Sequence, residues 1–275
     1  MLKLLKIEWL KIKNYNAFIV LVSFFALGVV ASNFIVYSTF NNSITKSAGV
    51  SMIMAAFNPY SFYNTWQTTS YVAGWILMLP SLLLIILVTN EFTYRTNRQN
   101  IIDGWSRNQF TSVKMMMALI AAILSTVLVF ITALVFGAAS HTDFSFNGIS
   151  HVGFFFLKAL SYNMLAIFMA VLIRRTGFAI AVFFIYMGAE NIISQLLDVW
   201  SVKLRTQDNL DLGSMGDYLP MGASDGLLTF PKNNLRDIAS SAFATNFTWL
   251  VLGIALAYLF IFYFFGKRRM LRSDL

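Results

Sequence analysis

The chain has 275 residues, of which 58% are hydrophobic and 12% are charged, and its mean hydropathy is +0.68. A soluble domain carries about 25% charged residues, so this composition excludes an ordinary soluble domain and indicates an integral membrane protein. There is no cysteine, which excludes disulfides, cysteine-ligated metal sites and a lipoprotein anchor, and the net charge of +8 is interpreted as a topology signal and not as a nucleic-acid-binding surface.

Residues 1–16 are predicted to form a helix that lies on the membrane surface. Its narrow apolar stripe consists of Leu2, Leu5, Trp9 and Ile12. The cations are not cleanly opposite this stripe, because Lys6 and Lys13 border it. A plain extension of the first span is the alternative interpretation.

Six stretches are apolar and long enough to cross a bilayer, which takes about 20 residues in a helix. They are residues 17–37, 71–89, 115–138, 152–173, 178–197 and 243–265. Pro80 is expected to kink the second of them, because proline removes a helix hydrogen bond. We therefore predict an all-α membrane protein in which residues 1–275 form a single transmembrane domain.

Cations are distributed unevenly over the connections between the predicted spans. Fourteen of the 20 Lys and Arg residues lie in the N-terminal arm, in residues 90–114, in residues 174–175 and in residues 266–275. These four segments lie on the same side of a six-span chain, and cations close to span ends favour the cytoplasmic side. Both termini and residues 90–114 are therefore predicted to be cytoplasmic.

The polar segment between the second and third spans carries strong signals for helix ends. Thr96 and Gln99 fit a capping box, and Gly104 fits the position just after a helix end, so a short helix is predicted at 97–103. Ser106 and Gln109 fit a second capping box that begins the third span.

On this short helix Arg98, Ile101 and Ile102 share a face, and Trp105 lies just beyond its end. An isolated helix of this length is marginal in water, so it needs a surface to pack on. Two interpretations stay open. The apolar side chains contact lipid headgroups or the chain's own helices, or they insert into a partner protein.

The same segment resembles the first cytoplasmic loop of ABC-2-type transporter permeases. The residues that match the family pattern are Glu91, Thr96, Arg98, Gln99, Gly104, Ser106, Arg107, Phe110 and Lys114. The six-span layout, the cationic N-terminal helix and the long segment 198–242 between the last two spans also match. Only residues 90–114 match in sequence.

The resemblance implies a permease subunit of a bacterial plasma membrane that works in export with an ABC ATPase and a second permease copy or paralogue. In the family this loop forms the coupling helix, which sits in a groove of the ATPase. The residues that would form this interface are Glu91, Arg98, Ile101, Ile102, Asp103, Trp105 and Arg107. The family also implies extracellular or re-entrant helices in 198–242.

The chain has no sequence of the form G-x-x-x-x-G-K-[ST], with which a P-loop binds phosphates. Gly266 and Lys267 are followed by arginine and lack the earlier glycine. The chain is therefore predicted not to be catalytic itself and to bind no cofactor. ATP and magnesium would be bound by the separate ATPase.

Ionisable residues inside predicted spans are candidates for function. Lys158 and Glu190 lie at similar depths in consecutive antiparallel spans, so we predict an ion pair between them. Separate contact of each with water is the alternative. By analogy with the family, Glu190 and Pro80 would lie near the translocation path.

Three other classes of function are weighed against the permease. A secondary transporter would show repeat symmetry and several buried charges. An intramembrane enzyme would need a nucleophile with a base, or a metal cluster, and His141 with Asp143 is too loosely spaced for a metal site. An ABC-2-like subunit that powers a cell-envelope process is the third. The sequence does not specify a substrate.

Overall fold

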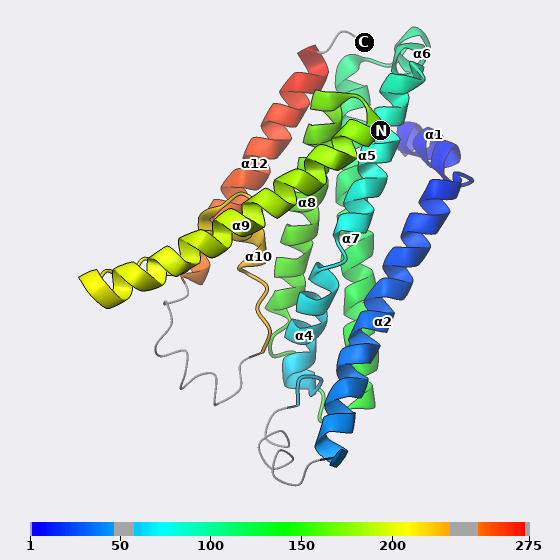
Figure 1. Ribbon diagram of the computed structural model, residues 1–275. Helices are drawn as coiled ribbons and strands as arrows, with labels where there is room; N and C mark the ends of the chain where they lie inside the picture. The colour runs from blue at the N-terminus through cyan, green and yellow to red at the C-terminus, as the bar shows by residue number, and fades with distance from the viewer. Residues whose placement is uncertain (1, 47–57, 232–246, 273–275) are drawn as a thin grey trace.

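The computed structural model describes residues 2–46, 58–231 and 247–272, and all secondary structure in these ranges is helical (Figure 1). The helices are α1 (Leu2–Ile12), α2 (Asn16–Lys46), α4 (Phe62–Gly74), α5 (Met78–Thr93), α6 (Thr96–Ile102), α7 (Arg107–Ala139), α8 (Ser150–Ile173), α9 (Thr176–Asp208), η1 (Met215–Tyr218), α10 (Gly222–Asp225) and α12 (Thr248–Arg272).

Five of these helices, α2, α7, α8, α9 and α12, are each long and apolar enough to cross a membrane. The pair α4 and α5 passes the same test together, with a bend of 43° between its halves. The prediction of an all-helical membrane protein is thus confirmed, with five such helices in the described residues, or six when the bent pair forms one span. Residues 243–246 of the sixth predicted span lie outside the described residues.

The bent pair differs from the predicted second span in where it starts and where it breaks. A turn at residues 75–77, shortly before Pro80, interrupts the α-helical hydrogen bonds, and Leu79 N–H donates to Ile76 O at 3.1 Å there. The helix begins at Phe62, nine residues before the predicted start at residue 71. Hydropathy missed α4 because it is rich in hydroxyl and amide side chains.

The hydroxyl side chains of Thr65, Thr68, Thr69 and Ser70 in α4 are buried against neighbouring helices instead of facing water. Thr65 Oγ1 donates to Ala133 O at 3.3 Å, and Trp66 Nε1 donates to Ser145 O at 2.9 Å. A buried hydroxyl or indole N–H needs such a partner. These bonds hold α4 against α7 and the α7–α8 connection, so α4 is part of the helical bundle.

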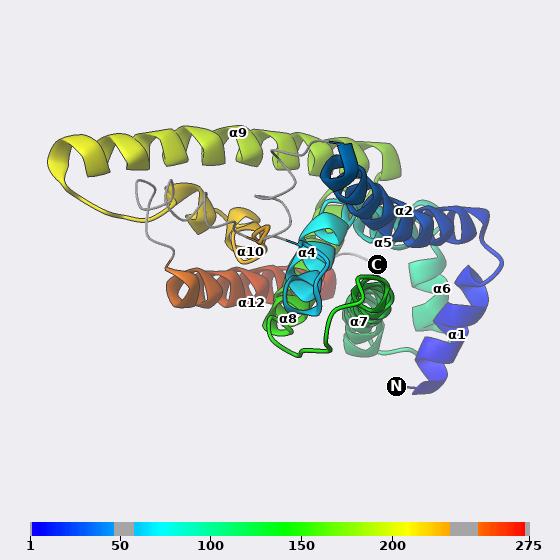
Figure 2. The same ribbon diagram turned by 90° about the horizontal axis from the view of Figure 1, so that it is seen from below.

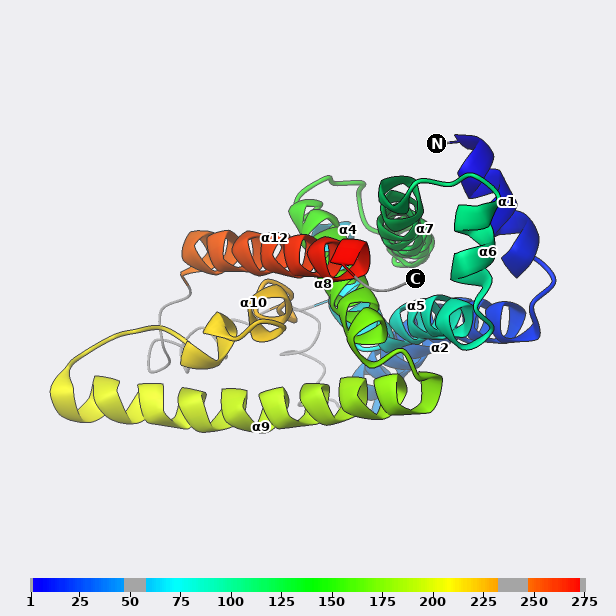
Figure 3. The ribbon, with the colours of Figure 1, turned by 90° about the horizontal axis from the view of Figure 1, so that it is seen from above.

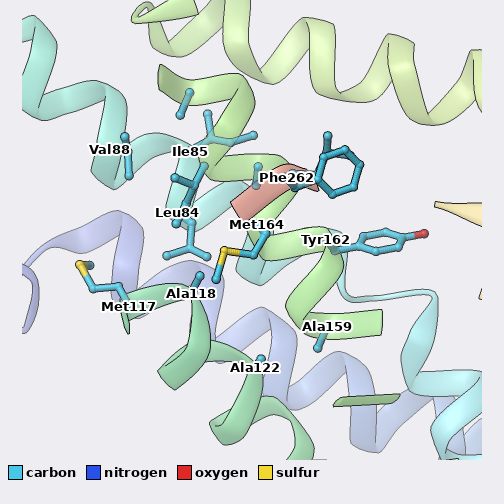
Figure 4. Close-up of a cluster of buried hydrophobic side chains, with 14 of the residues drawn as sticks. Leu84, Ile85, Val88, Met117, Ala118, Ala122, Ala159, Tyr162, Met164 and Phe262 are labelled. Atoms are coloured by element: carbon cyan, nitrogen blue, oxygen red, sulfur yellow. The ribbon is translucent and has the colours of Figure 1, made fainter. Parts of the chain in front are cut away.

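Helix α8 lies at the centre of the bundle, in contact with α4, α5, α7 and α12. Small side chains such as Ala118 and Ala159 let α7 and α8 approach closely, and Met164 and Phe262 fill the space beside them (Figure 4). Asn163 Nδ2 donates to Ala118 O at 3.2 Å and so joins α8 to α7 inside this apolar core.

Helix α9 leaves the bundle at an angle, and η1 and α10 lie between it and α12 (Figures 1 and 3). A Cβ at Gly216 in η1 would overlap Ser194 Oγ on α9, so only glycine allows this close approach. Short helices between the last two spans were predicted. Helix α9 continues 11 residues beyond the predicted span end at residue 197. The prediction followed the apolar stretch, whereas the helix extends into polar residues up to Asp208.

Candidate functional site

Of the two capping boxes predicted in the polar segment 90–110, the structure contains one. Ser106 Oγ accepts from Gln109 N–H at 3.2 Å while Gln109 Oε1 accepts from Ser106 N–H at 3.0 Å, so the second capping box is confirmed. Gly104 follows the end of α6 with φ +95°, as predicted. The first capping box is wrong. The chain enters α6 through Arg95 at φ 55°, which makes Thr96 the first helical residue.

Helix α6 presents one face to the protein and one face outward. Asn97 and Asn100 are buried, whereas Arg98 and Asp103 are exposed and Ile102 is 80% exposed. The exposed residues are part of the predicted partner interface. A single exposed apolar side chain does not by itself mark a contact surface, so the partner role of Ile102 stays a prediction from the resemblance.

Four other members of the predicted interface lie in different environments. Ile101 is half-buried and Arg107 is exposed at the start of α7. Trp105 is only 9% exposed and packs in the main core, where Lys11 Nζ lies 5.7 Å from its ring centroid. Trp105 thus contacts the chain's own helices, which is the alternative interpretation, and its assignment to a partner interface stays a prediction.

Glu91, the fourth member, is buried in a network of charges that we call the ion cluster, formed by Glu8, Lys11, Glu91 and Lys114. Lys114 Nζ lies 2.8 Å from Glu91 Oε1 and is also paired with Glu8. Lys11 Nζ lies 2.9 Å from Glu8 Oε1 and 3.5 Å from Glu91 Oε1. Glu91 is thus occupied within the chain, which corrects its assignment to the partner interface.

The ion cluster contains two carboxylates and two ammonium groups, so its formal charges cancel. This balance matters because the Lys114 side chain is only 1% exposed. A buried charge without a partner lowers the free energy of unfolding by roughly several kcal/mol. Burial by itself raises the pKa of Glu8, but Lys114 and then Lys11 outweigh it, and the pKa lies below its ordinary value.

The ion cluster joins four helices at one end of the bundle. Glu8 and Lys11 come from α1, Glu91 from α5 and Lys114 from α7, and Lys11 Nζ also donates to Asn100 Oδ1 of α6 at 3.2 Å. Figure 2 shows α1 alongside α6 at this end. The buried face of α6 is therefore bonded to the ion cluster through Asn100, and its opposite face stays exposed.

A second candidate site is a pocket of about 330 Å³ between the α4–α5 break, α8, α9, η1 and α10, which we call the α10 pocket. Both Lys158 and Glu190 line it. The predicted ion pair between them is wrong, however. Lys158 Nζ pairs with Asp225 Oδ1 at 3.1 Å, and Glu190 Oε1 accepts the backbone N–H groups of Met221 and of Gly222, the latter at 2.8 Å.

The physical reason is that α8 and α9 diverge and the segment after α9 folds back into the space between them. Each charge then finds a nearer partner on that segment. Sequence reasoning missed Asp225 and Asp217 because nothing local marks a loop that returns to the bundle. Tyr162 had a signal, since it lies one turn after Lys158, and its hydroxyl donates to Asp225 Oδ2 at 2.9 Å.

Asp217 of η1 also lines the α10 pocket. Burial, followed by the nearby carboxylates of Asp198 and Asp225, raises the pKa of Asp217 to about 7. A group with this pKa changes its charge near neutral pH.

No cluster of three or more His, Cys, Asp or Glu side chains with metal-binding geometry occurs in the part of the chain that the structure describes.

No protein-family model matches the chain, and a search of curated proteins finds no match either.

Proposed function

We propose that this chain is the membrane-spanning permease subunit of an ABC-2-type transporter, which exports a substrate with ATP hydrolysed by a separate ATPase chain. Two permease copies, or this chain and a paralogue, would form the membrane channel in the plasma membrane, with α6 on the cytoplasmic side. The observation that carries the proposal is the form of α6: a seven-residue helix, followed by Gly104 at positive φ, with its outward face exposed.

The mounting of α6 supports a mechanical role. A seven-residue helix is marginal by itself, so its order must come from the contacts beneath it. Asn100 is bonded to Lys11 of the ion cluster, and buried Trp105 closes the turn to α7. If a bound ATPase displaced α6 at the exposed Ile102, the displacement would thus be transmitted to α1, α5 and α7, because α6 is bonded to the ion cluster that joins them.

The path from α6 to the α10 pocket supports the same role. Helix α5 runs from α6 to the break at residues 75–77, and both Gly74, the last residue of α4, and Trp75, in the break, line the pocket. A helix break is a place where two halves of a span can move separately. Closure of an ATPase against α6 would then change the pocket through α5.

Co-purification from the native host tests the proposal. We expect a chain with a P-loop to be recovered in stoichiometric amount in a mild detergent, and to be lost in Ile102→Asp, because an acid would replace the apolar contact. The control is Ile149→Asp, a half-exposed isoleucine of the α7–α8 connection at the other end of the bundle, which should retain the ATPase. Recovery of the chain alone in every mild detergent would contradict the proposal.

A further inference from the structure

The α10 pocket has more acidic than basic side chains. Three carboxylates line it, those of Glu190, Asp217 and Asp225, against the single ammonium group of Lys158. The ion pair between Lys158 and Asp225 neutralises one carboxylate and leaves Glu190 uncompensated, while Asp217 adds a carboxyl group that gains its negative charge near neutral pH. An anionic ligand is therefore disfavoured here, and a cationic ligand is favoured.

The two carboxylate oxygens of Glu190 differ in their hydrogen-bond partners. Glu190 is only 7% exposed, and its Oε1 accepts hydrogen bonds from the backbone N–H groups of Met221 and Gly222. Oε2 is buried and has no hydrogen-bond partner among the described residues, although Tyr186 lies beside the same carboxylate from one turn earlier on α9. A buried carboxylate oxygen without a donor is costly, and a bound cation would satisfy it.

The walls of the pocket supply aromatic faces next to these acids. Tyr71 and Trp75 pack edge to face with ring centroids 6.3 Å apart, and the Trp75 side chain is 69% exposed. Lys158 Nζ lies 5.4 Å from the Tyr162 ring centroid while it pairs with Asp225. The pocket thus already holds one ammonium group between a carboxylate and an aromatic ring, which are the groups that recognise organic cations.

We infer that the α10 pocket binds the ammonium group of an amphiphilic organic cation, with Glu190 facing the charge and Trp75 and Tyr71 covering the apolar body. As a statement of substrate class this rests on the proposed function, because a permease needs such a site. The ammonium group belongs either to a soluble cation that is exported or to the headgroup of an aminophospholipid.

Three indole compounds that differ mainly in charge test the inference on the purified chain in dodecyl maltoside. Tryptamine carries an ammonium group, tryptophol is neutral and indole-3-propionate is an anion. Isothermal titration calorimetry should give the tightest binding for tryptamine and the weakest for indole-3-propionate. The reverse order, or no saturable binding of tryptamine to a monodisperse chain, would overturn the inference.

Two variants with opposite expected effects identify the site. Glu190→Gln should weaken tryptamine binding about tenfold and leave tryptophol unchanged, because only the charge is removed. Lys158→Met should strengthen tryptamine binding several-fold, because it removes the internal ammonium group that competes for Asp225. Asp208→Asn, an exposed acid at the end of α9, is the matched control and should change nothing. Equal loss of tryptophol and tryptamine in Glu190→Gln would assign Glu190 a structural role only and overturn the inference.

Competition with lipids identifies the source of the ammonium group. Displacement of tryptamine by phosphatidylethanolamine, but not by phosphatidylglycerol, assigns the pocket to a lipid headgroup. Displacement by neither assigns it to a soluble cation. Displacement by phosphatidylglycerol alone would show an anion site and overturn the inference. These measurements use the chain without an ATPase, so their failure is distinct from a failure of co-purification.

Discussion

The ion cluster and the α10 pocket both hold charged side chains inside an apolar bundle, but they balance those charges differently. In the ion cluster two carboxylates meet two ammonium groups, and Lys114 has both acids as partners. In the α10 pocket three carboxyl groups meet one ammonium group, so the two sites differ in charge balance; Glu190 Oε2, like Glu91 Oε2 in the ion cluster, has no hydrogen-bond partner among the described residues. A closed, balanced set of charges fixes helices relative to one another, whereas an unbalanced set beside a cavity is suited to a ligand.

The largest effect should come from opening the balanced set. Lys114→Met would leave the buried carboxylates of Glu8 and Glu91 facing each other with only Lys11 between them. We expect a loss of about 3–5 kcal/mol in the free energy of unfolding, measured by thermal unfolding in detergent. Lys13→Met removes an exposed lysine of the same end and should cost little. Equal stability of these two variants would contradict the structural role of the ion cluster.

Trp105→Ala should be the next most damaging change. The indole is buried in the core next to Lys11, so its removal leaves a cavity and should destabilise the protein by about 3 kcal/mol. The same thermal unfolding measurement applies, with Phe146→Ala, an exposed aromatic residue, as the control. If Trp105→Ala loses the ATPase at unchanged stability, the indole belongs to the partner interface after all.

Gly216→Ala tests the wall of the α10 pocket. A Cβ at this position would overlap Ser194 Oγ and come within 2.8 Å of Asp198 Oδ2, so η1 must shift away from α9. We expect a loss of about 1–3 kcal/mol and weaker tryptamine binding. Gly188→Ala is the control, because a Cβ there meets nothing within 4 Å. Unchanged binding and stability in Gly216→Ala would show that η1 does not shape the pocket.

The smallest effect should be the pH dependence that Asp217 gives to the unbalanced site, and this dependence has the opposite sign to the one expected from the lowered pKa of Glu8. The pKa of Asp217 is raised from 3.8 to about 7 in the fold, so the folded chain holds a proton that the unfolded chain releases. The free energy of unfolding should therefore fall as the pH rises from about 4 to about 7. Asp217→Asn should remove this part of the slope in thermal unfolding between these pH values. An identical slope in the variant would contradict the burial of Asp217 among Asp198 and Asp225.

The sequence predicted what depends on local patterns. Long apolar stretches identify membrane helices by length alone, and the second capping box at Ser106 depends only on residues three positions apart. The sequence could not predict contacts between distant segments. Lys114 and Glu8 are separated by 106 positions, and their pairing is a property of the packed bundle.

The same limit explains the errors at the candidate sites. Helix periodicity placed Trp105 next to Ile102, but it could not tell which of the two meets α1. The Lys158–Glu190 pair was predicted from adjacent helices, and the folded-back segment with Asp225 separates them. Helix α4 escaped detection because hydropathy counts its buried Thr65 as polar although that hydroxyl is bonded inside the bundle.

Site-directed crosslinking at α6 tests the central claim most directly. The chain contains no cysteine, so Ile102→Cys provides a single thiol on the exposed face of α6. With a thiol-specific photocrosslinker in native membranes, we predict a covalent adduct with a chain that bears a P-loop, and none from Ile149→Cys. Absence of the adduct from Ile102→Cys, or labelling by lipid alone, would contradict the assignment of α6 as the coupling helix.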